Sequence, residues 1–244
     1  MLNRPAKKNA ISTRMLADMK QAFDDLHQEK KVRGVIVTGA GDAFSSGTDL
    51  LEIKDAMNDE NVQSKWFADC MAQKDLIEAM LRFPKPIIAA VNGPAMGLGA
   101  ALVMASDLVV GTEKALIGFP ETRRGLVAGI AAPLLAFRLG SSLAADFLLR
   151  AEPASAQECL AVGVYRWIVN EDLVWAKADA LARDMCSKGP AAISLTKRLL
   201  NETIGEHLFT QLSSGAAATA SARTTESAAE GIQAFLEKRD PAWP

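Results

Sequence analysis

The 244-residue sequence has few of the residues that disulfide scaffolds, zinc sites and many catalytic centres require. It contains three cysteines and two histidines. The cysteines, Cys70, Cys159 and Cys186, are far apart and show no CxxC spacing, which argues against a disulfide framework and a zinc site. We therefore expect no metal ion, and a reducing, cytoplasmic location.

The sequence also lacks an excess of one charge and any long apolar run. Lysine and arginine number 27 against 29 acidic residues, a formal net charge of -2. An almost neutral protein has no overall field to draw it to nucleic acid or to an anionic membrane. No apolar run reaches the ~18 residues of a membrane span, and the first residues carry no signal-peptide pattern. We expect neither nucleic acid nor a membrane as a partner.

Hydrophobic residues are plentiful, at 49% of the sequence, enough for a sizeable core in one large domain or in a core with a small appendage. Apolar residues at helical spacing after Ser12 predict a helix over 12–29. Similar patterns predict helices over about 62–82 and over 97–106.

Short apolar runs closed by turn residues predict buried strands between and after these helices. They lie at 34–38, 87–91, 108–110, 115–118 and 164–169. Because strands and helices alternate, we expect an α/β fold. The last part of the chain shows helical periodicity only, and its Ala-rich stretch 216–229 is expected to be helix rather than linker. We therefore predict a core over 1–188 and a C-terminal helical region over 189–244.

Two glycine-rich segments, 39–50 and 92–99, each follow a predicted buried strand. Glycine allows the backbone to approach a ligand closely, and the second segment opens a helix whose unpaired first-turn N–H groups suit a negative charge. The alternative is that these glycines only form tight turns. A Rossmann phosphate loop is excluded on spacing, because Phe44 stands where a third glycine is needed.

Glu121 follows the predicted strand 115–118 and precedes Gly125. An apolar neighbourhood would disfavour the ionised carboxylate and raise its pKa toward the range of a useful general base. The alternative is a solvated carboxylate in a loop. Which of these two interpretations holds depends on whether apolar residues or solvent surround the Glu121 carboxylate.

Five segments, taken together and in order, resemble the crotonase superfamily, also called the enoyl-CoA hydratase/isomerase family. They are residues 2–12, 37–50, 91–99, 120–126 and 234–239. Each match alone is weak, but their ordered occurrence over nearly the whole chain is specific. The resemblance implies a spiral of ββα units with a C-terminal helical trimerisation region. It also implies a homo-oligomer, either a trimer or a dimer of trimers.

The resemblance further implies an enzyme that binds an acyl-CoA thioester and stabilises its enolate with the backbone N–H groups of Thr48 and Leu98. Two fixed donors aimed at the thioester oxygen stabilise the enolate more than the neutral ground state. No metal or separate cofactor is then required, since coenzyme A enters as part of the substrate.

The same resemblance implies how coenzyme A is held. Backbone near Ser46, Thr48 and Leu50 would bind its adenine and pantetheine portions. Phe235 and Lys238 would reach the coenzyme A of a neighbouring subunit, with Lys238 near the 3′-phosphate. The alternative for Lys238 is a solvated cation near the C-terminus of a helix.

One position departs from the pattern of the family's hydratases, which usually have glutamates at the positions of both Ala101 and Glu121. Two carboxylates serve the addition of water well, whereas one suffices to carry a proton from one carbon to another. The sequence therefore predicts double-bond isomerisation by Glu121. An atypical hydratase, a CoA-ester decarboxylase or hydrolase, and a non-catalytic CoA-binding homologue remain as alternatives.

The remaining candidates lie outside these motifs. His27 and His207 are expected at the surface. Cys70, with Trp66 and Leu76 on the same predicted helix, is expected in the core or in the wall of an acyl pocket.

Overall fold

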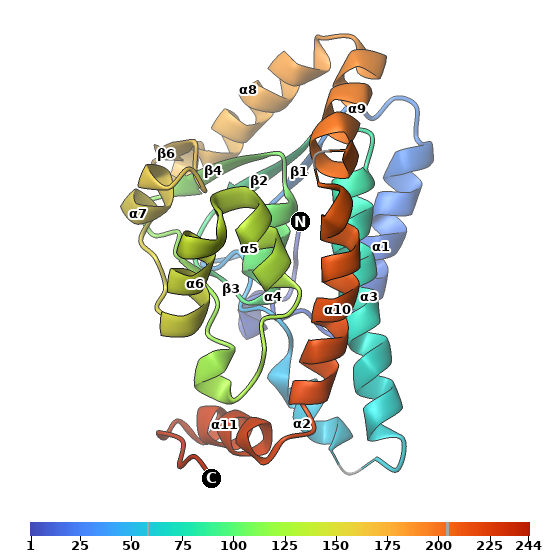
Figure 1. Cartoon of the computed structure of the whole chain (residues 1–244). Coiled ribbons are helices and arrows are strands. Elements are labelled where there is room, and N and C mark those ends of the chain that lie inside the picture. Colours follow the sequence, from blue (N-terminus) through green and yellow to red (C-terminus); the bar gives the residue numbers. More distant parts are fainter. Residues whose placement is uncertain (58, 204) are drawn as a thin grey trace.

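A four-stranded parallel sheet forms the centre of the protein in the computed structural model, which describes residues 1–57, 59–203 and 205–244 (Figure 1). Its strands, in spatial order, are β1 (Val35–Val37), β2 (Ile87–Val91), β4 (Leu108–Thr112) and β6 (Trp167–Val169). A second parallel pair consists of β3 (Ala95–Met96) and β5 (Ile117–Gly118).

The central strand β2 is buried at every residue, as a strand covered on both faces of a parallel sheet must be. Because successive side chains point to opposite faces, Ile87, Ala89 and Val91 join the main hydrophobic core. Ile88 and Ala90 pack on the other face, in a smaller core with residues of helix α8 (Val174–Cys186). The apolar run therefore forms a strand between two helical layers.

Helices account for most of the remaining chain. Before α8 they are η1 (Pro5–Lys7), α1 (Thr13–Gln28), α2 (Leu50–Ala56), α3 (Val62–Arg82), α4 (Leu98–Ala105), η2 (Thr122–Arg124), α5 (Ala131–Leu139), α6 (Ser141–Arg150), α7 (Ala156–Ala161) and η3 (Glu171–Leu173). After it come α9 (Pro190–Arg198), the π-helical segment η4 (Leu199–Thr203), α10 (Glu206–Ala222) and α11 (Glu226–Glu237).

The last two helices pack in different places. Helix α10 runs along α3, and α11 lies at the lower end of the molecule in Figure 1, against α2 and η2. A small apolar cluster joins these elements: Ile53, Trp66, Leu126, Ala228 and Ile232. The C-terminal helices therefore enclose the segment that contains Glu121.

The predicted helices and strands and the α/β class are confirmed, and Ser12 caps α1 by accepting a hydrogen bond from the Met15 N–H at 3.2 Å. The stretch 216–229, expected to be helix rather than linker, is helical on both sides of a short break at 223–225. Helix α10 ends at Ala222, and Thr225 begins α11 by accepting a hydrogen bond from the Ala228 N–H at 3.1 Å. Threonine favours such caps because its hydroxyl replaces a missing backbone acceptor.

The division of the chain at 188 and 189 stays a prediction, although the elements described after residue 189 are helical. Across the residues that the structure describes, no helix is long and apolar enough to cross a membrane.

Candidate active site

A cavity of about 330 Å³ collects most of the site residues predicted from the sequence. Ser46, Thr48, Leu50, Leu98, Glu121 and Phe235 line it. Lys238 is not among the described lining residues; it ends helix α11 as an exposed side chain. This position agrees with the alternative of a solvated cation at a helix C-terminus.

The two glycine-rich segments meet in this cavity. Ser45 and Ala95 form a parallel bridge, and the Met96 N–H donates to the Ser45 carbonyl at 2.8 Å. A Cβ added at Gly47 would lie 2.7 Å from the Met96 carbonyl oxygen, and the φ of Gly47 is +87°. Only glycine fits this close approach without strain. Residues 47 and 48 are thereby held against the start of α4.

Two backbone N–H groups at this junction donate to no described residue. Leu98 is the first residue of α4, where an N–H has no intrahelical acceptor. On the other segment the Asp49 N–H donates to the Ile11 carbonyl at 3.0 Å, but among the described residues neither the Thr48 nor the Leu98 N–H donates a hydrogen bond. Two fixed donors beside the positive end of a helix suit an oxyanion.

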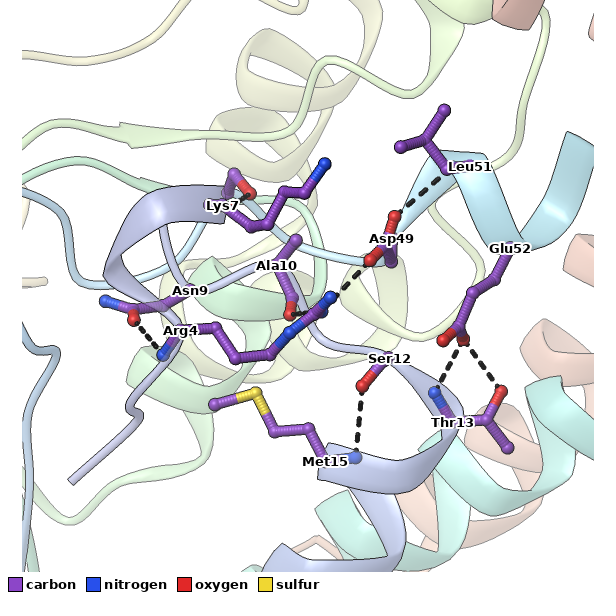
Figure 2. Close-up of polar contacts among 12 residues, drawn as sticks. Arg4, Lys7, Asn9, Ala10, Ser12, Thr13, Met15, Asp49, Leu51 and Glu52 are labelled. Carbon is purple, nitrogen blue, oxygen red and sulfur yellow. Dashed lines mark hydrogen bonds and ion pairs between the residues drawn. The ribbon is translucent and has the colours of Figure 1, made fainter.

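A polar network holds the segment that contains Thr48 (Figure 2). The Nη1 of Arg4 donates to Asp49 Oδ2 at 3.0 Å and to the Ala10 carbonyl at 2.6 Å. Asp49 in turn caps α2 by accepting a hydrogen bond from the Leu51 N–H at 3.3 Å. The arginine of the N-terminal turn therefore fixes the loop next to the predicted oxyanion donors.

Glu121, the residue that begins η2, lies beside the junction of the two glycine-rich segments, because a Cβ added at Gly97 would be 2.9 Å from its Oε1. Its Oε2 is buried and has no hydrogen-bond partner in the part of the chain that the structure describes. Burial raises the pKa of the Glu121 carboxyl to about 7, against a smaller lowering by its own backbone and by the Arg124 guanidinium. A carboxyl with this pKa can accept and return a proton near neutral pH.

Ala101, a buried residue that also lines the cavity, offers no second titratable group. Of the described lining residues, Asp49 and Glu121 are the acidic ones, and Arg4 holds Asp49. Glu121 is therefore the lining carboxylate that is free to take part in proton transfer.

Sequence reasoning missed several polar residues in the wall, among them Arg124, Gln73 and Arg223. Arg124 follows Glu121 by three residues and packs over the Phe235 ring, with its guanidinium carbon 4.2 Å from the ring centroid. Phe235 thus lines the cavity of its own chain, and its predicted contact with a neighbouring subunit stays a prediction. Gln73 and Arg223 also line the cavity, but they belong to no motif that could have indicated them.

The other sequence candidates are structural. Cys70 is fully buried, and burial raises the pKa of its thiol to about 11, so the thiolate nucleophile is scarce at neutral pH. Trp66 and Leu76 are core residues, His207 is exposed, and His27 packs edge-on against Phe83. In the described ranges, no group of His, Cys, Asp and Glu side chains is placed to hold a metal ion.

Comparisons with known proteins point to one family. The family profile described as "Enoyl-CoA hydratase/isomerase" matches residues 1–244. A Thermus thermophilus protein named "Putative enoyl-CoA hydratase" is 36% identical over 98% of this chain and 94% of its own length. A "Short-chain-enoyl-CoA hydratase" from Clostridium acetobutylicum is 29% identical over 98% of this chain and 90% of its own.

A solved structure of an enoyl-CoA hydratase/isomerase from Xanthobacter autotrophicus Py2 has a TM-score of 0.88 at 30% identity. It covers 99% of this chain and 94% of its own. The likeness in fold confirms the crotonase-like α/β spiral expected from the sequence.

Proposed function

Because the chain belongs to the enoyl-CoA hydratase/isomerase family and is an enzyme of that family, we propose that it moves the double bond of an enoyl-CoA thioester with Glu121 as its single proton carrier. Coenzyme A enters as part of the substrate, and no metal or further cofactor takes part. The observation that supports this reaction is the Glu121 carboxyl, whose buried Oε2 has no partner among the described residues, in a wall where Ala101 offers no second carboxylate.

The proposed reaction is a proton transfer between two carbons of the acyl chain. The thioester oxygen accepts hydrogen bonds from the Thr48 and Leu98 N–H groups. Glu121 removes a proton from C2 of a 3-enoyl thioester, and the electron pair moves into a dienolate whose charge rests on the thioester oxygen. The same carboxyl returns the proton to C4, which leaves a 2-enoyl thioester. The two donors lower the barrier because negative charge grows on the oxygen they contact.

The test uses 3-enoyl-CoA and 2-enoyl-CoA thioesters of increasing length in deuterated water. Isomerisation predicts interconversion of the two series with deuterium at C2 and C4. Formation of 3-hydroxyacyl-CoA as the main product would overturn the proposal in favour of an atypical hydratase. Release of free coenzyme A would instead identify a hydrolase. A decarboxylase would leave both enoyl series unchanged and would release carbon dioxide only from a malonyl-type thioester assayed beside them. A non-catalytic CoA-binding homologue would bind the thioesters and exchange nothing.

We place the coenzyme A portion at the exposed end of the cavity. Ser46 and Leu50 line this part of the wall, and the exposed Lys7 and Lys8 supply positive charge for phosphate groups. Phe235 and Lys238 would approach the coenzyme A of a neighbouring subunit. Sedimentation at micromolar concentration should detect a trimer or a dimer of trimers, and a stable monomer would contradict this arrangement. Activity should survive a chelator, since no metal takes part.

We also propose a cytoplasmic location, from the cysteine pattern alone. A Danio rerio relative, 30% identical over the whole chain, is named as mitochondrial. Fractionation of the source cells decides between the two compartments.

A further inference from the structure

Away from the proposed coenzyme A end, the wall of the cavity contains a polar cluster formed by Asp69 and Gln73 of α3 and by Arg223 at the end of α10. Arg223 Nη1 donates to Asp69 Oδ2 at 2.7 Å, and Gln73 Nε2 donates to the same oxygen at 2.9 Å. Gln73 and Arg223 both line the cavity, although they are only 4% and 3% exposed. The surface that these two side chains retain therefore faces the cavity.

The exposure of the lining residues distinguishes an open side of the cavity from a closed interior. Lys7, Lys8 and Ser46, together with Leu51, Val127 and Phe235, are exposed and mark its open side, whereas Gln73 and Arg223 are buried and mark its interior. Given the proposed function, a thioester with its coenzyme A at the open side directs its acyl group into the interior. The end of the acyl group then approaches the polar cluster.

The guanidinium of Arg223 has an edge that no residue in the described part of the chain uses. Its Nη1 is taken by Asp69, but its Nε is buried without a partner, and its Nη2 donates no hydrogen bond to any residue in the described ranges. Nε and Nη2 together form the side edge of a guanidinium, which binds a carboxylate through two parallel hydrogen bonds. Leaving a buried donor unpaired is costly, so an acceptor here stabilises the site.

Two observations favour a ligand site over a purely structural ion pair between Arg223 and Asp69. An ion pair that only ties α3 to α10 is complete with the bond between Arg223 and Asp69. It explains neither the unpaired side edge nor the position of Gln73 and Arg223 in the cavity wall. An alkyl chain ending here would offer the guanidinium no acceptor, whereas a terminal oxygen that reaches its side edge would.

We propose that this cluster selects acyl-CoA thioesters whose acyl group ends in an oxygen acceptor, a carboxylate fitting best. This inference rests on the proposed function, because it requires the acyl-CoA to bind in this cavity. Arg223 and Asp69 together carry no net charge, so the ligand's terminal oxygen is held by hydrogen bonds from the side edge of the guanidinium. Gln73 helps to hold Asp69 in place.

The test measures binding of carbon-matched saturated thioesters by calorimetry. Pentanoyl-CoA, 5-hydroxypentanoyl-CoA and glutaryl-CoA differ only in a terminal methyl, hydroxymethyl or carboxylate group, and hexanoyl-CoA with adipoyl-CoA repeats the comparison at greater length. At one of the two lengths, an oxygen-terminated ligand should bind at least about tenfold tighter than its alkyl partner, as a hydrogen bond to a charged group provides. Preference for the carboxylate over the hydroxyl identifies the preferred acceptor. Equal or weaker binding of every oxygen-terminated ligand would overturn the proposal.

Two conservative variants separate ligand selection from packing. R223K keeps a cation for Asp69 but removes the side edge, so it should abolish most of the preference and leave alkyl-CoA binding within about twofold. D69N removes the internal acceptor and should increase the preference for the carboxylate. R123K is the matched control, since Arg123 lies outside the cavity wall and pairs with Glu152. If R223K weakened the binding of alkyl-terminated and oxygen-terminated thioesters equally, the role of Arg223 would be structural alone.

Failure of this inference is distinguishable from failure of the proposed function. If the protein does not bind acyl-CoA in this cavity, none of the five thioesters binds and both proposals fall. If it binds them without regard to the terminal group, only the selectivity is wrong.

Discussion

Two acidic side chains in the described cavity wall, Asp49 and Glu121, differ in their surroundings. Asp49 accepts hydrogen bonds from Arg4 and from the Leu51 N–H, so its charge is neutralised and its geometry fixed. Glu121 Oε2 has no partner among the residues described, and its pKa is raised by burial. A carboxylate that a cation holds positions the backbone, whereas one without a partner is free to exchange a proton. The same functional group thus serves two purposes, and each prediction below alters one side of this comparison.

The largest effect is expected from Glu121→Gln, which removes the proton carrier and keeps the shape of the side chain. Turnover should fall by at least about 10²-fold, the lower end of what a positioned acid or base contributes, while CoA-ester binding stays nearly unchanged. Steady-state rates and calorimetric binding on the best substrate test this. Glu152→Gln, at an exposed residue, is the matched control. Full activity in Glu121→Gln would rule out the single-carboxylate mechanism and favour chemistry driven by the Thr48 and Leu98 donors alone.

A smaller loss is expected from Asp49→Asn, which breaks the ion pair with Arg4 but keeps a side chain that can cap α2. The loop next to the oxyanion donors becomes less well fixed, so turnover should fall by roughly tenfold, because slight misplacement of catalytic groups is costly. The pH dependence of the rate should keep its shape, since Glu121 is untouched. A shifted pH profile in Asp49→Asn would mean that Asp49 itself exchanges the proton.

The unpartnered state of Glu121 also predicts an effect on stability. Its folded-state pKa of about 7 lies above the usual value of 4.5, so the folded protein holds the proton more tightly than the unfolded chain. This contribution is fully present below about pH 4.5 and is lost as the pH rises through 7. Relative to the wild type, Glu121→Gln should therefore gain roughly 1–3 kcal/mol of unfolding free energy between pH 5 and pH 8. Urea denaturation at the two pH values measures this, and no relative gain would show that the carboxyl is solvated.

The smallest effect is expected from Ala101→Glu, which places a second carboxylate in the cavity wall that contains Glu121. Like charges raise the pKa of one member of such a pair, so the pH profile of the rate should move upward by about one unit. The variant also supplies the second carboxylate that hydration uses, so 3-hydroxyacyl-CoA should appear among the products. Ala101→Gln, which has the same size and no charge, is the control. An unchanged profile would place residue 101 out of reach of Glu121.

Much of the fold and part of the site followed from local sequence patterns. Apolar spacing is a property of neighbouring residues, so helix α1 and the buried strand β2 could be predicted within one or two residues. The two glycine-rich segments and Glu121 lie in short motifs, each next to a strand. The family resemblance of these motifs identified Thr48 and Leu98, and all three residues do line one cavity.

Tertiary structure decided the rest. Arg223 and Asp69 are 154 residues apart and meet only because α10 packs along α3. Helical periodicity predicts which face of each helix is apolar, but not which other helix covers that face. For the same reason, the sequence could not predict that Phe235 packs against Arg124, or that Glu121 Oε2 lacks a partner among the described residues. Local patterns determined the elements and the short motifs around Thr48, Leu98 and Glu121, whereas the burial of distant faces against one another decided which side chains line the cavity.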